Sequence, residues 1–259
     1  MCMMQSIMID SHCHLADPKF SSDLSEVIGR ALASGIDRFV SIADTLEEGD
    51  KCLELAENYD QIFCTMGVHP HAASTWDTEV GKSKIVEASQ NPKMVAVGEV
   101  GLDYHYMNSP KEDQIRAFRD QIQIAKALDL PLVVHNRESI EDLLDIIREL
   151  EPPSLVLHCN TEKWEDCSEL IDRGYLFGFT GIATYPKSED IRNTIKECPI
   201  EQMMIETDAP YLSPEGYRGK RCEPAFVIEV AQLIAGIKQV SLEEVDRITT
   251  ENTVKFYGL

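Results

Sequence analysis

Six side chains that could bind a metal ion stand at or shortly after the ends of apolar, strand-like runs. They are His12, His14, Glu99, His135, His158 and Asp208. Imidazole nitrogens and carboxylate oxygens are ligands that zinc and related divalent ions accept. The pattern therefore indicates the chemistry of a metal site.

His12 and His14 are separated by one residue. Side chains two apart on a strand project from the same face, so the two imidazoles can share one ion. A strand-turn histidine pair satisfied by backbone groups is the alternative. The pair alone does not decide between the two interpretations.

The six side chains can be divided between two ions. We expect the first ion to have three ligands, His12, His14 and Asp208. His135 and His158 would bind the second ion, with Glu99 between the two, because a carboxylate can bridge cations and a neutral imidazole cannot. Two divalent ions about 3.5–4 Å apart lower the pKa of a bridging water and hold both the attacking and the leaving oxygen. Metal-assisted hydrolysis is the predicted class of reaction.

Asp208 is the predicted general base. A carboxylate can bind a metal ion and also accept the proton of the attacking water. Glu99 is expected to contribute to catalysis by holding the two ions together. The alternative is that Asp208 only caps the loop before Pro210.

The segments around these side chains must bring them together. Apolar runs rich in β-branched residues predict strands at residues 7–11, 37–43, 62–68, 94–99, 131–135, 154–158, 175–180 and 203–207. Helical periodicity predicts helices at residues 23–34, 46–59, 112–128, 139–150, 164–173, 188–198, 226–236 and 241–257. Near-continuous apolar strands that alternate with helices indicate a parallel sheet covered on its outer face.

This order predicts an α/β fold, a TIM (β/α)8 barrel in a single domain over residues 1–259, with residues 1–7 as an N-terminal extension. Such barrels need roughly 250 residues, and their active sites lie on the rim where the strands end. An open, doubly wound sheet is the alternative. The Gly-rich dinucleotide fingerprint of that fold is absent after the first predicted strand.

The chain carries a net charge of −21 and eight cysteines without a C-x-x-C pair. This charge excludes binding of nucleic acid through a broad basic surface, since Lys and Arg supply most of that affinity. It does not exclude a nucleic-acid enzyme, because bound cations and a local basic loop can reverse the field. No apolar stretch reaches the roughly 18 residues of a membrane span. We expect a cytoplasmic protein with buried, unpaired cysteines and no membrane partner.

Basic and aromatic side chains lie in loops after the predicted strands. The expected phosphate contacts are Arg137, Arg218, Lys220 and Arg221. An arginine fork matches the geometry of a phosphate, but the alternative is that these cations pair with surface acids. Aromatic rings can stack on the bases of a single strand. The available tyrosines are Tyr104, Tyr106, Tyr185, Tyr211 and Tyr217.

Seven segments of the chain resemble the TatD family of metal-dependent deoxyribonucleases, within the amidohydrolase-like metal-hydrolase superfamily. They read IDSHCHL at 9–15, GVHPH at 67–71, VGEVGLD at 97–103, PLVVHNR at 131–137, HC at 158–159, ETDAPYL at 206–212 and RGKRCEP at 218–224. The segments follow the family's order and intervals over essentially the whole chain. Cys222 replaces the usual Asn, and Asn160-Thr161 replaces an aromatic and a small residue, so both departures bear on substrate choice.

The resemblance implies a TIM barrel that hydrolyses phosphodiester bonds with divalent metal, as a 3′-to-5′ exonuclease on DNA. It implies metal ligation by the same six residues, and a catalytic role for His71 in substrate contact or proton transfer. A turn histidine beside Pro70 is the alternative for His71. The expected cofactor is two divalent ions, Mg, Mn or Zn. The expected substrate is a DNA end or single-stranded DNA, with no obligate protein partner.

Two other functions stay open. A small-molecule amidohydrolase, lactonase or phosphoesterase could use the same ligands. In several such enzymes a modified lysine bridges the ions at the end of the fourth strand, where this chain has Glu99, and Lys93 lies at the other end of that strand. This disfavours the lysine-bridged branch. A metal-stabilised scaffold protein is the third possibility, for which removal of Asp208 would damage folding and no substrate would be turned over.

Overall fold

Eight parallel strands pair in chain order in the computed structural model, which describes residues 8–259. The strands are β1 Met8–Cys13, β2 Ile36–Ser41, β3 Ile62–Met66, β4 Met94–Asp103, β5 Leu132–Arg137, β6 Leu155–Leu157, β7 Leu176–Phe179 and β8 Met203–Ile205. A bridge between Cys13 and Ala209 joins β1 to the segment after β8, so the sheet forms a nearly closed barrel. The predicted single-domain α/β barrel is confirmed. The N-terminal extension predicted at residues 1–7 lies outside the described residues.

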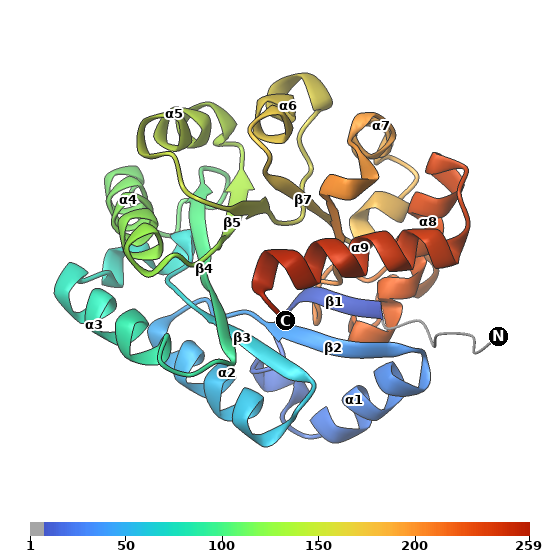
Figure 1. The fold of residues 1–259 in the computed structure, drawn as a ribbon, viewed down its shortest axis with the longest axis horizontal. Coiled ribbons are helices and arrows are strands. Elements are labelled where there is room, and N and C mark those ends of the chain that lie inside the picture. Colours follow the sequence, from blue (N-terminus) through green and yellow to red (C-terminus); the bar gives the residue numbers. More distant parts are fainter. Residues whose placement is uncertain (1–7) are drawn as a thin grey trace.

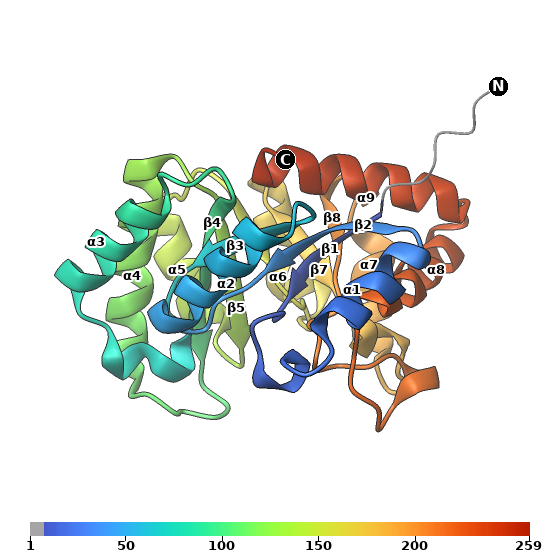
Figure 2. The ribbon, with the colours of Figure 1, turned by 90° about the horizontal axis from the view of Figure 1, so that it is seen from below.

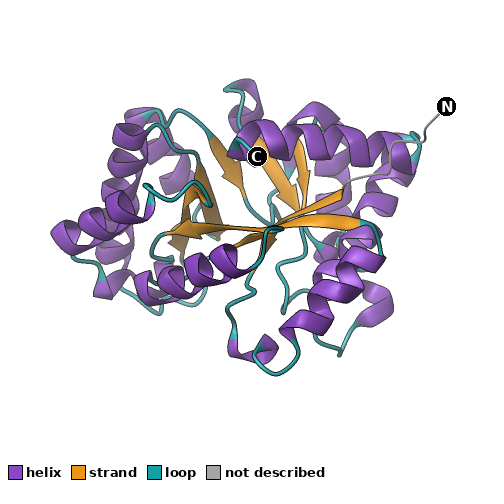
Figure 3. Cartoon of the chain, turned by 60° about the horizontal axis from the view of Figure 1, so that its bottom comes forward, coloured by secondary structure: helices purple, strands orange, loops and turns teal. Residues whose placement is uncertain are grey.

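Helices cover the outside of the barrel, as Figures 1 and 3 show. They are α1 Leu24–Ala33, α2 Leu46–Asn58, α3 Thr78–Ala88, α4 Lys111–Leu128, α5 Ile140–Leu150, α6 Trp164–Asp172, α7 Glu189–Glu197, α8 Val227–Lys238 and α9 Leu242–Tyr257. Eight of these were predicted from the sequence, with ends that differ by one or two residues. The exception is α3.

The sequence gives only a weak signal for α3. Asp77 caps its first turn by accepting a hydrogen bond from Val80 N. Val80 is exposed, however, and Gly81 interrupts the apolar stripe. Gly81 packs against Trp76, where a Cβ would lie 2.3 Å from the indole ring. The helix α3 is therefore stabilised by packing against Trp76. This packing does not produce the periodic apolar pattern by which the other helices were predicted.

The strands β4 and β5 run past their predicted ends at residues 99 and 135. Residues 100–103 of β4 pair with residues 134–137 of β5. The neighbouring strand β3 pairs with β4 only as far as Val97. Glu99 and His135 therefore lie within a two-stranded ribbon that continues beyond the adjacent strands, and the prediction that both residues end their strands was wrong.

Gly101 allows the two strands of this ribbon to approach. Its φ is +132°, and a Cβ there would lie 2.1 Å from the carbonyl oxygen of His135. We expect Gly101→Ala to lower the free energy of unfolding by about 4 kcal/mol, because backbone strain and overpacking act together. Urea denaturation measures this change. Gly29→Ala is the matched control, since nothing lies near that helical position; its expected effect is a gain of about 0.5–1 kcal/mol. Equal stability of the two variants would contradict this account of the ribbon.

Side chains from the strands and from the end of α9 fill the barrel. Val40, Val133, Phe256 and Tyr257 belong to one buried cluster. The Tyr257 hydroxyl donates a hydrogen bond to the carbonyl oxygen of Ser11 at 3.0 Å. Figure 2 shows α9 lying across the end of the barrel where β1 begins. The opposite end, where the strands finish, is the end at which a site can open.

Polar contacts close the seam between β1 and the segment after β8. Asp10 accepts hydrogen bonds from the amide and the hydroxyl of Thr207, at 2.9 and 2.6 Å. The amide of Asp208 donates to the carbonyl oxygen of His12 at 2.9 Å. These bonds place Asp208 beside His12 and His14 although the two segments lie far apart in the chain.

Two expectations from composition concern cysteines and membrane spans. The seven cysteines among residues 8–259 are unpaired, and all but Cys159 are buried. No single helix in this part of the chain is long and apolar enough to cross a membrane. The segments Pro224–Lys238 and Leu242–Tyr257 reach that length and composition only when taken together, and they bend by 112° at their junction.

Candidate metal centre

The buried side chain of Glu99 lies at the centre of a histidine–carboxylate cluster. The cluster comprises His12, His14, His69, Glu99, His135, His158 and Asp208. The two carboxylate oxygens of Glu99 contact different members of this cluster. All six residues predicted to bind metal are therefore brought together, and His69, left unassigned from the sequence, joins them.

Oxygen Oε2 of Glu99 faces the ligands predicted for the first ion. It lies 3.3 Å from His12 Nε2 and 4.0 Å from His14 Nε2. These two nitrogens are 3.3 Å apart, and Asp208 Oδ1 lies 3.2 Å from His14 Nε2 and 3.7 Å from His12 Nε2. Atoms bound to one ion at about 2.0–2.2 Å lie roughly 3–3.5 Å from one another. The donor atoms of His12, His14 and Asp208 lie within 4.8 Å of one another and could hold one divalent ion, with Glu99 beside them.

Oxygen Oε1 of Glu99 faces the remaining histidines. It lies 3.0 Å from His135 Nδ1, 3.7 Å from His69 Nε2 and 4.0 Å from His158 Nε2. The ring of His158 stacks on that of His12, with centroids 3.4 Å apart. His135 and His158, predicted to share the second ion, thus approach the same oxygen, but His158 also lies next to the first group.

Hydrogen bonding shows why His69 differs from the other histidines. Its Nδ1 accepts a hydrogen bond from the backbone amide of His71 at 3.1 Å. Burial and the neighbouring His135 lower the pKa of His69 well below its ordinary value, so the ring is neutral. A neutral ring whose Nδ1 accepts must carry its proton on Nε2. In this tautomer His69 directs its Nε2–H toward Glu99, 3.7 Å from Oε1, although its ring nitrogen also lies in a group with Glu99 and His135 that could hold an ion.

Two further carboxylates orient the histidines on the Oε1 side. Asp103 Oδ2 lies 3.1 Å from His135 Nε2, which leaves His135 Nδ1 directed at Glu99. Glu206 Oε1 lies 2.7 Å from His158 Nδ1, which leaves Nε2 for the site. Carboxylates behind ligand histidines fix the ring orientation and raise the basicity of the ligand nitrogen.

The sequence interpretation did not include Asp103, Glu206 or Asp44, whose Oδ1 lies 3.8 Å from His14 Nδ1. Each of the three stands at the end of a strand or within a few residues of it. That signal was present in the sequence. The pairing of each acid with a particular histidine depends on side chains that meet across strands, which spacing along the chain does not give.

The charges of the cluster favour a bound cation. Burial lowers the pKa of His158, but the negative charges of Glu206 and Glu99 outweigh this effect and raise the pKa to about 9. Burial likewise opposes the charge on His14, and Asp44 and Asp208 still raise its pKa well above the ordinary value. Both shifts show that the neighbouring carboxylates stabilise a positive charge at these rings. A divalent ion supplies the same charge once the histidines release their protons, so the residues present fit a metal.

His71 lies beside the cluster and is partly exposed. Its Nε2 is 2.9 Å from Asp103 Oδ2, the oxygen that also contacts His135 Nε2. One carboxylate oxygen therefore holds both a partly exposed histidine and a predicted ligand. This position is compatible with the predicted role of His71 in contacting substrate.

The four predicted phosphate contacts have different surroundings. Arg137, Arg218 and Lys220 are exposed, and Arg137 and Arg218 lie over tyrosine rings at 5.0 and 4.6 Å. Arg221 is held by Asp23 at 2.6 Å and by a second acid at 3.1 Å. The guanidinium of Arg221 is thus engaged as the alternative interpretation expects. Arg218 also lies 3.5 Å from Glu215, but its side chain, like those of Arg137 and Lys220, is exposed.

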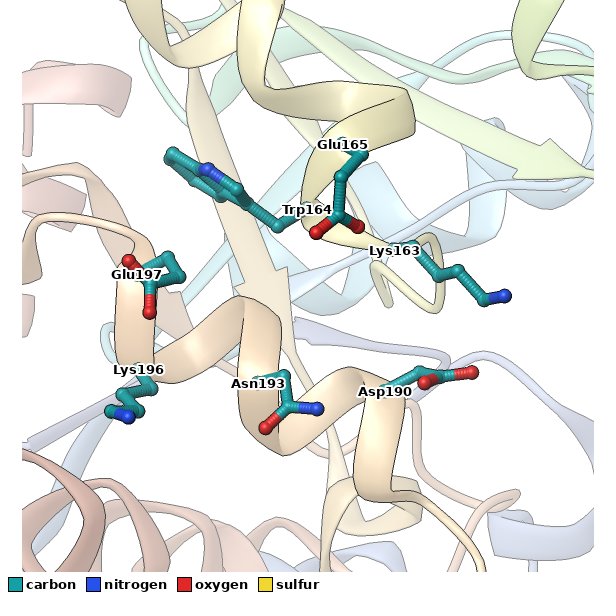
Figure 4. Close-up of a pocket in the computed structure, with 7 residues that line it drawn as sticks. All are labelled: Lys163, Trp164, Glu165, Asp190, Asn193, Lys196 and Glu197. Atoms are coloured by element: carbon teal, nitrogen blue, oxygen red, sulfur yellow. The ribbon is translucent and has the colours of Figure 1, made fainter.

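A separate pocket of about 460 Å³ lies between α6 and α7 (Figure 4). Its lining residues are Lys163, Trp164, Glu165, Asp190, Asn193, Lys196 and Glu197. This lining contains no histidine and no member of the histidine–carboxylate cluster. We therefore assign the chemistry to the cluster and not to this pocket.

Known proteins resemble the chain over almost its whole length. The family model described as TatD related DNase matches residues 9–258. The uncharacterized metal-dependent hydrolase YabD of Bacillus subtilis is 38% identical over 98% of this chain and 100% of its own. The 3′-5′ ssDNA/RNA exonuclease TatD of Citrobacter koseri is 33% identical over 97% and 99%. The crystal structure of YJJV, a TatD homolog from Escherichia coli, superposes with a TM-score of 0.93 at 27% identity, covering 99% of this chain and 100% of that one.

Proposed function

The chain belongs to the TatD-related DNase family and is a metal-dependent hydrolase, and we propose that it is a deoxyribonuclease that removes nucleotides from the 3′ end of DNA. One observation carries the proposal. The two oxygens of the buried Glu99 carboxylate face two sets of histidines, at 3.3 Å on one side and 3.0 Å on the other. Such a bridge suits the pair of ions that in-line displacement at phosphorus uses.

The first ion has four ligands in this proposal, His12, His14, Glu99 and Asp208. The second ion is bound by His135 and His158 on the Oε1 side of Glu99. Mixed imidazole and carboxylate sites accept several divalent metals, so Mg, Mn and Zn are the candidates. When bound, the ions polarise the phosphate and lower the pKa of the attacking water.

The chain's own groups supply the proton transfer and the substrate contacts. Burial raises the pKa of Asp208, but the hydrogen bond with His14 and the nearby His158 outweigh this effect. The net pKa is lowered, so the carboxylate is ionised. It can therefore accept the proton of the attacking water. His71, held by Asp103, contacts the substrate or assists proton transfer. The phosphates are contacted by Arg137, Arg218 and Lys220, whereas Arg221 stays paired with Asp23.

The charge of the molecule limits how DNA is held. With a net charge of −21, affinity for DNA depends on the bound cations and on a few local contacts. The substrate in this proposal is a single-stranded 3′ end, and no obligate protein partner is required. Unpaired cysteines are typical of proteins from reducing compartments, which supports a cytoplasmic location.

The proposal is tested with metal-stripped protein reloaded separately with Mg, Mn or Zn. The substrates are single-stranded oligonucleotides labelled at the 3′ or the 5′ end. We expect stepwise release of mononucleotides from the 3′ end with at least one metal, and no release without metal. If no metal supports release while a lactone or a carboxylic ester is hydrolysed, the small-molecule hydrolase is the correct function.

A further inference from the structure

Two exposed tyrosines stand at opposite ends of the metal centre. The exposed large hydrophobic side chains among residues 8–259 are Leu32, Val80, Val86, Tyr106, Met107 and Tyr211. Leu32 lies on α1, and Val80 and Val86 lie on α3, among the outer helices. Tyr106 and Tyr211 each contact a histidine at or beside the centre. A ligand that binds at the site would therefore cover these two exposed tyrosines.

Tyr211 lies next to the first group of ligands. Its ring centroid is 5.9 Å from that of His14, with the rings at 70°, and its amide donates to the carbonyl oxygen of Asp208. The Tyr211 hydroxyl donates a hydrogen bond to Asp17 Oδ2 at 2.8 Å. Lys19 Nζ lies 4.2 Å from the ring centroid. These contacts fix the orientation of a ring that remains 42% exposed.

Tyr106 lies beyond the other side of the centre. Its ring is 5.4 Å from that of His71, at 89°, and 55% of the residue is exposed. The Tyr106 amide donates to Asp103 Oδ1 at 2.8 Å, so the carboxylate that holds His71 and His135 also anchors this residue. The guanidinium of Arg137 lies 5.0 Å from the ring centroid.

A series of contacts runs through the cluster, with Tyr211 at one end of the series and Tyr106 at the other. From Tyr211 the contacts lead through His14 and His12 to Glu99. They continue from Glu99 through His135 and Asp103 to His71 and so to Tyr106. Each end combines an exposed aromatic ring with a nearby cation. Aromatic rings stack on any nucleobase, and cations beside them attract the phosphate backbone.

The other tyrosines in these loops are engaged differently. The Tyr104 hydroxyl donates to Asp142, and Lys111 Nζ lies over the ring. Tyr217 stacks on Phe226 with centroids 4.1 Å apart. The Tyr185 hydroxyl donates to the carbonyl oxygen of Ser213. All three tyrosines are only partly exposed, and within residues 8–259 none of them makes a ring contact with a histidine of the cluster. Tyr106 and Tyr211 are thereby distinguished from the larger set of tyrosines in the sequence.

On the basis of the proposed nuclease function, we infer that Tyr106 and Tyr211 stack on the nucleobases that flank the scissile phosphate, one base at each end of the metal centre. The site then accepts a dinucleotide unit whose phosphate lies over the cluster. Recognition by stacking does not depend on base identity. It requires unpaired bases, which makes single-stranded ends the substrate.

The test compares Tyr106→Ala and Tyr211→Ala with the corresponding Phe variants. Substrates are a normal single-stranded oligonucleotide and two versions that lack either the last or the penultimate 3′ base. Each Ala variant is expected to raise KM for the normal oligonucleotide roughly 5- to 100-fold, which corresponds to the loss of one stacked base. The Phe variants retain the ring and should stay near the wild-type KM. Leu32→Ala, an exposed apolar side chain on α1, is the control for surface substitution.

The abasic substrates provide a readout that general damage would not reproduce. One Ala variant should match the wild type on the substrate that lacks the last base, and the other on the substrate that lacks the penultimate base. Ala variants with the wild-type KM, or with equal losses on all three substrates, overturn the inference and leave the nuclease function standing. Binding of a phosphorothioate-ended oligonucleotide to the metal-loaded wild type is measured alongside. If the wild type neither binds it nor releases nucleotides, both the function and the inference fail.

Discussion

We expect Asp208→Asn to lower kcat for nucleotide release by about a thousandfold or more and to leave the protein folded. The amide cannot accept the proton of the attacking water, and general-base catalysis alone contributes roughly 10²–10⁴-fold. The substitution also removes a negative charge 3.2 Å from His14 Nε2 and 3.8 Å from His158 Nε2. Weakened metal binding therefore adds to the loss.

The choice of Asn follows from the backbone at this position. Asp208 has a φ of +58°, a left-handed conformation that Asn tolerates better than most residues. Alanine would add backbone strain to the chemical change. Asp129→Asn is the matched control, because that exposed aspartate also lies in the left-handed region, with a φ of +54°, at the end of α4.

Initial rates at saturating metal, together with near-ultraviolet circular dichroism, separate the chemical effect from unfolding. Asp129→Asn should keep the wild-type kcat. If kcat for Asp208→Asn stays above about a tenth of the wild-type value, the loss is smaller than the removal of a general base should cause. It would exclude Asp208 as the base and leave it as a cap of the loop.

We expect Glu99→Gln to abolish most of the stabilisation that metal confers on the protein. Both oxygens of Glu99 contact ligand histidines, so one substitution weakens both sides of the centre. Wild-type protein with metal at a hundred times its Kd should gain about 2.7 kcal/mol for each bound ion. For a chain of this size that gain raises Tm by roughly 5–10 °C. The variant is expected to gain less than about a third of that rise.

Scanning calorimetry with stepwise metal addition measures this difference, and elemental analysis counts the bound ions. We expect two ions in the wild type and fewer in the variant. Glu243→Gln, an exposed acid in the first turn of α9, is the control for loss of one charge. A metal-dependent rise in Tm for Glu99→Gln equal to that of the wild type would show that the carboxylate does not bridge the ions.

The barrel could be predicted because its strands are buried on both faces and therefore read as apolar runs. The same logic ended β4 at Glu99, where the polar residue interrupts the run. Pairing with β5 carries the strand on to Asp103, and that pairing depends on Gly101 approaching the backbone of His135. The apolar pattern of a sequence does not show where two strands approach each other closely, so the extension of β4 could not be predicted.

The convergence of the proposed metal ligands could be predicted because their residue types are rare and their positions follow strand ends. The groups behind them could not. Asp103 and Glu206 are two among the 45 acids of the chain, and only the folded barrel pairs them with His135 and His158. The role of His69 depends on which ring nitrogen carries the proton. That is decided by a backbone amide two residues away.

The seam between β1 and the segment after β8 makes the two halves of the centre unequal during folding. In the proposed centre, Glu99 and His135 lie on β4 and β5 and His158 follows β6, so the second ion would be held by residues from the middle of the chain. The first ion would need His12 and Asp208 together, and these meet only where Asp10 accepts hydrogen bonds from Thr207, 197 residues away in sequence. Long-range contacts of this kind form late. We therefore expect the proposed site of the first ion to form only once the segment after β8 has joined β1.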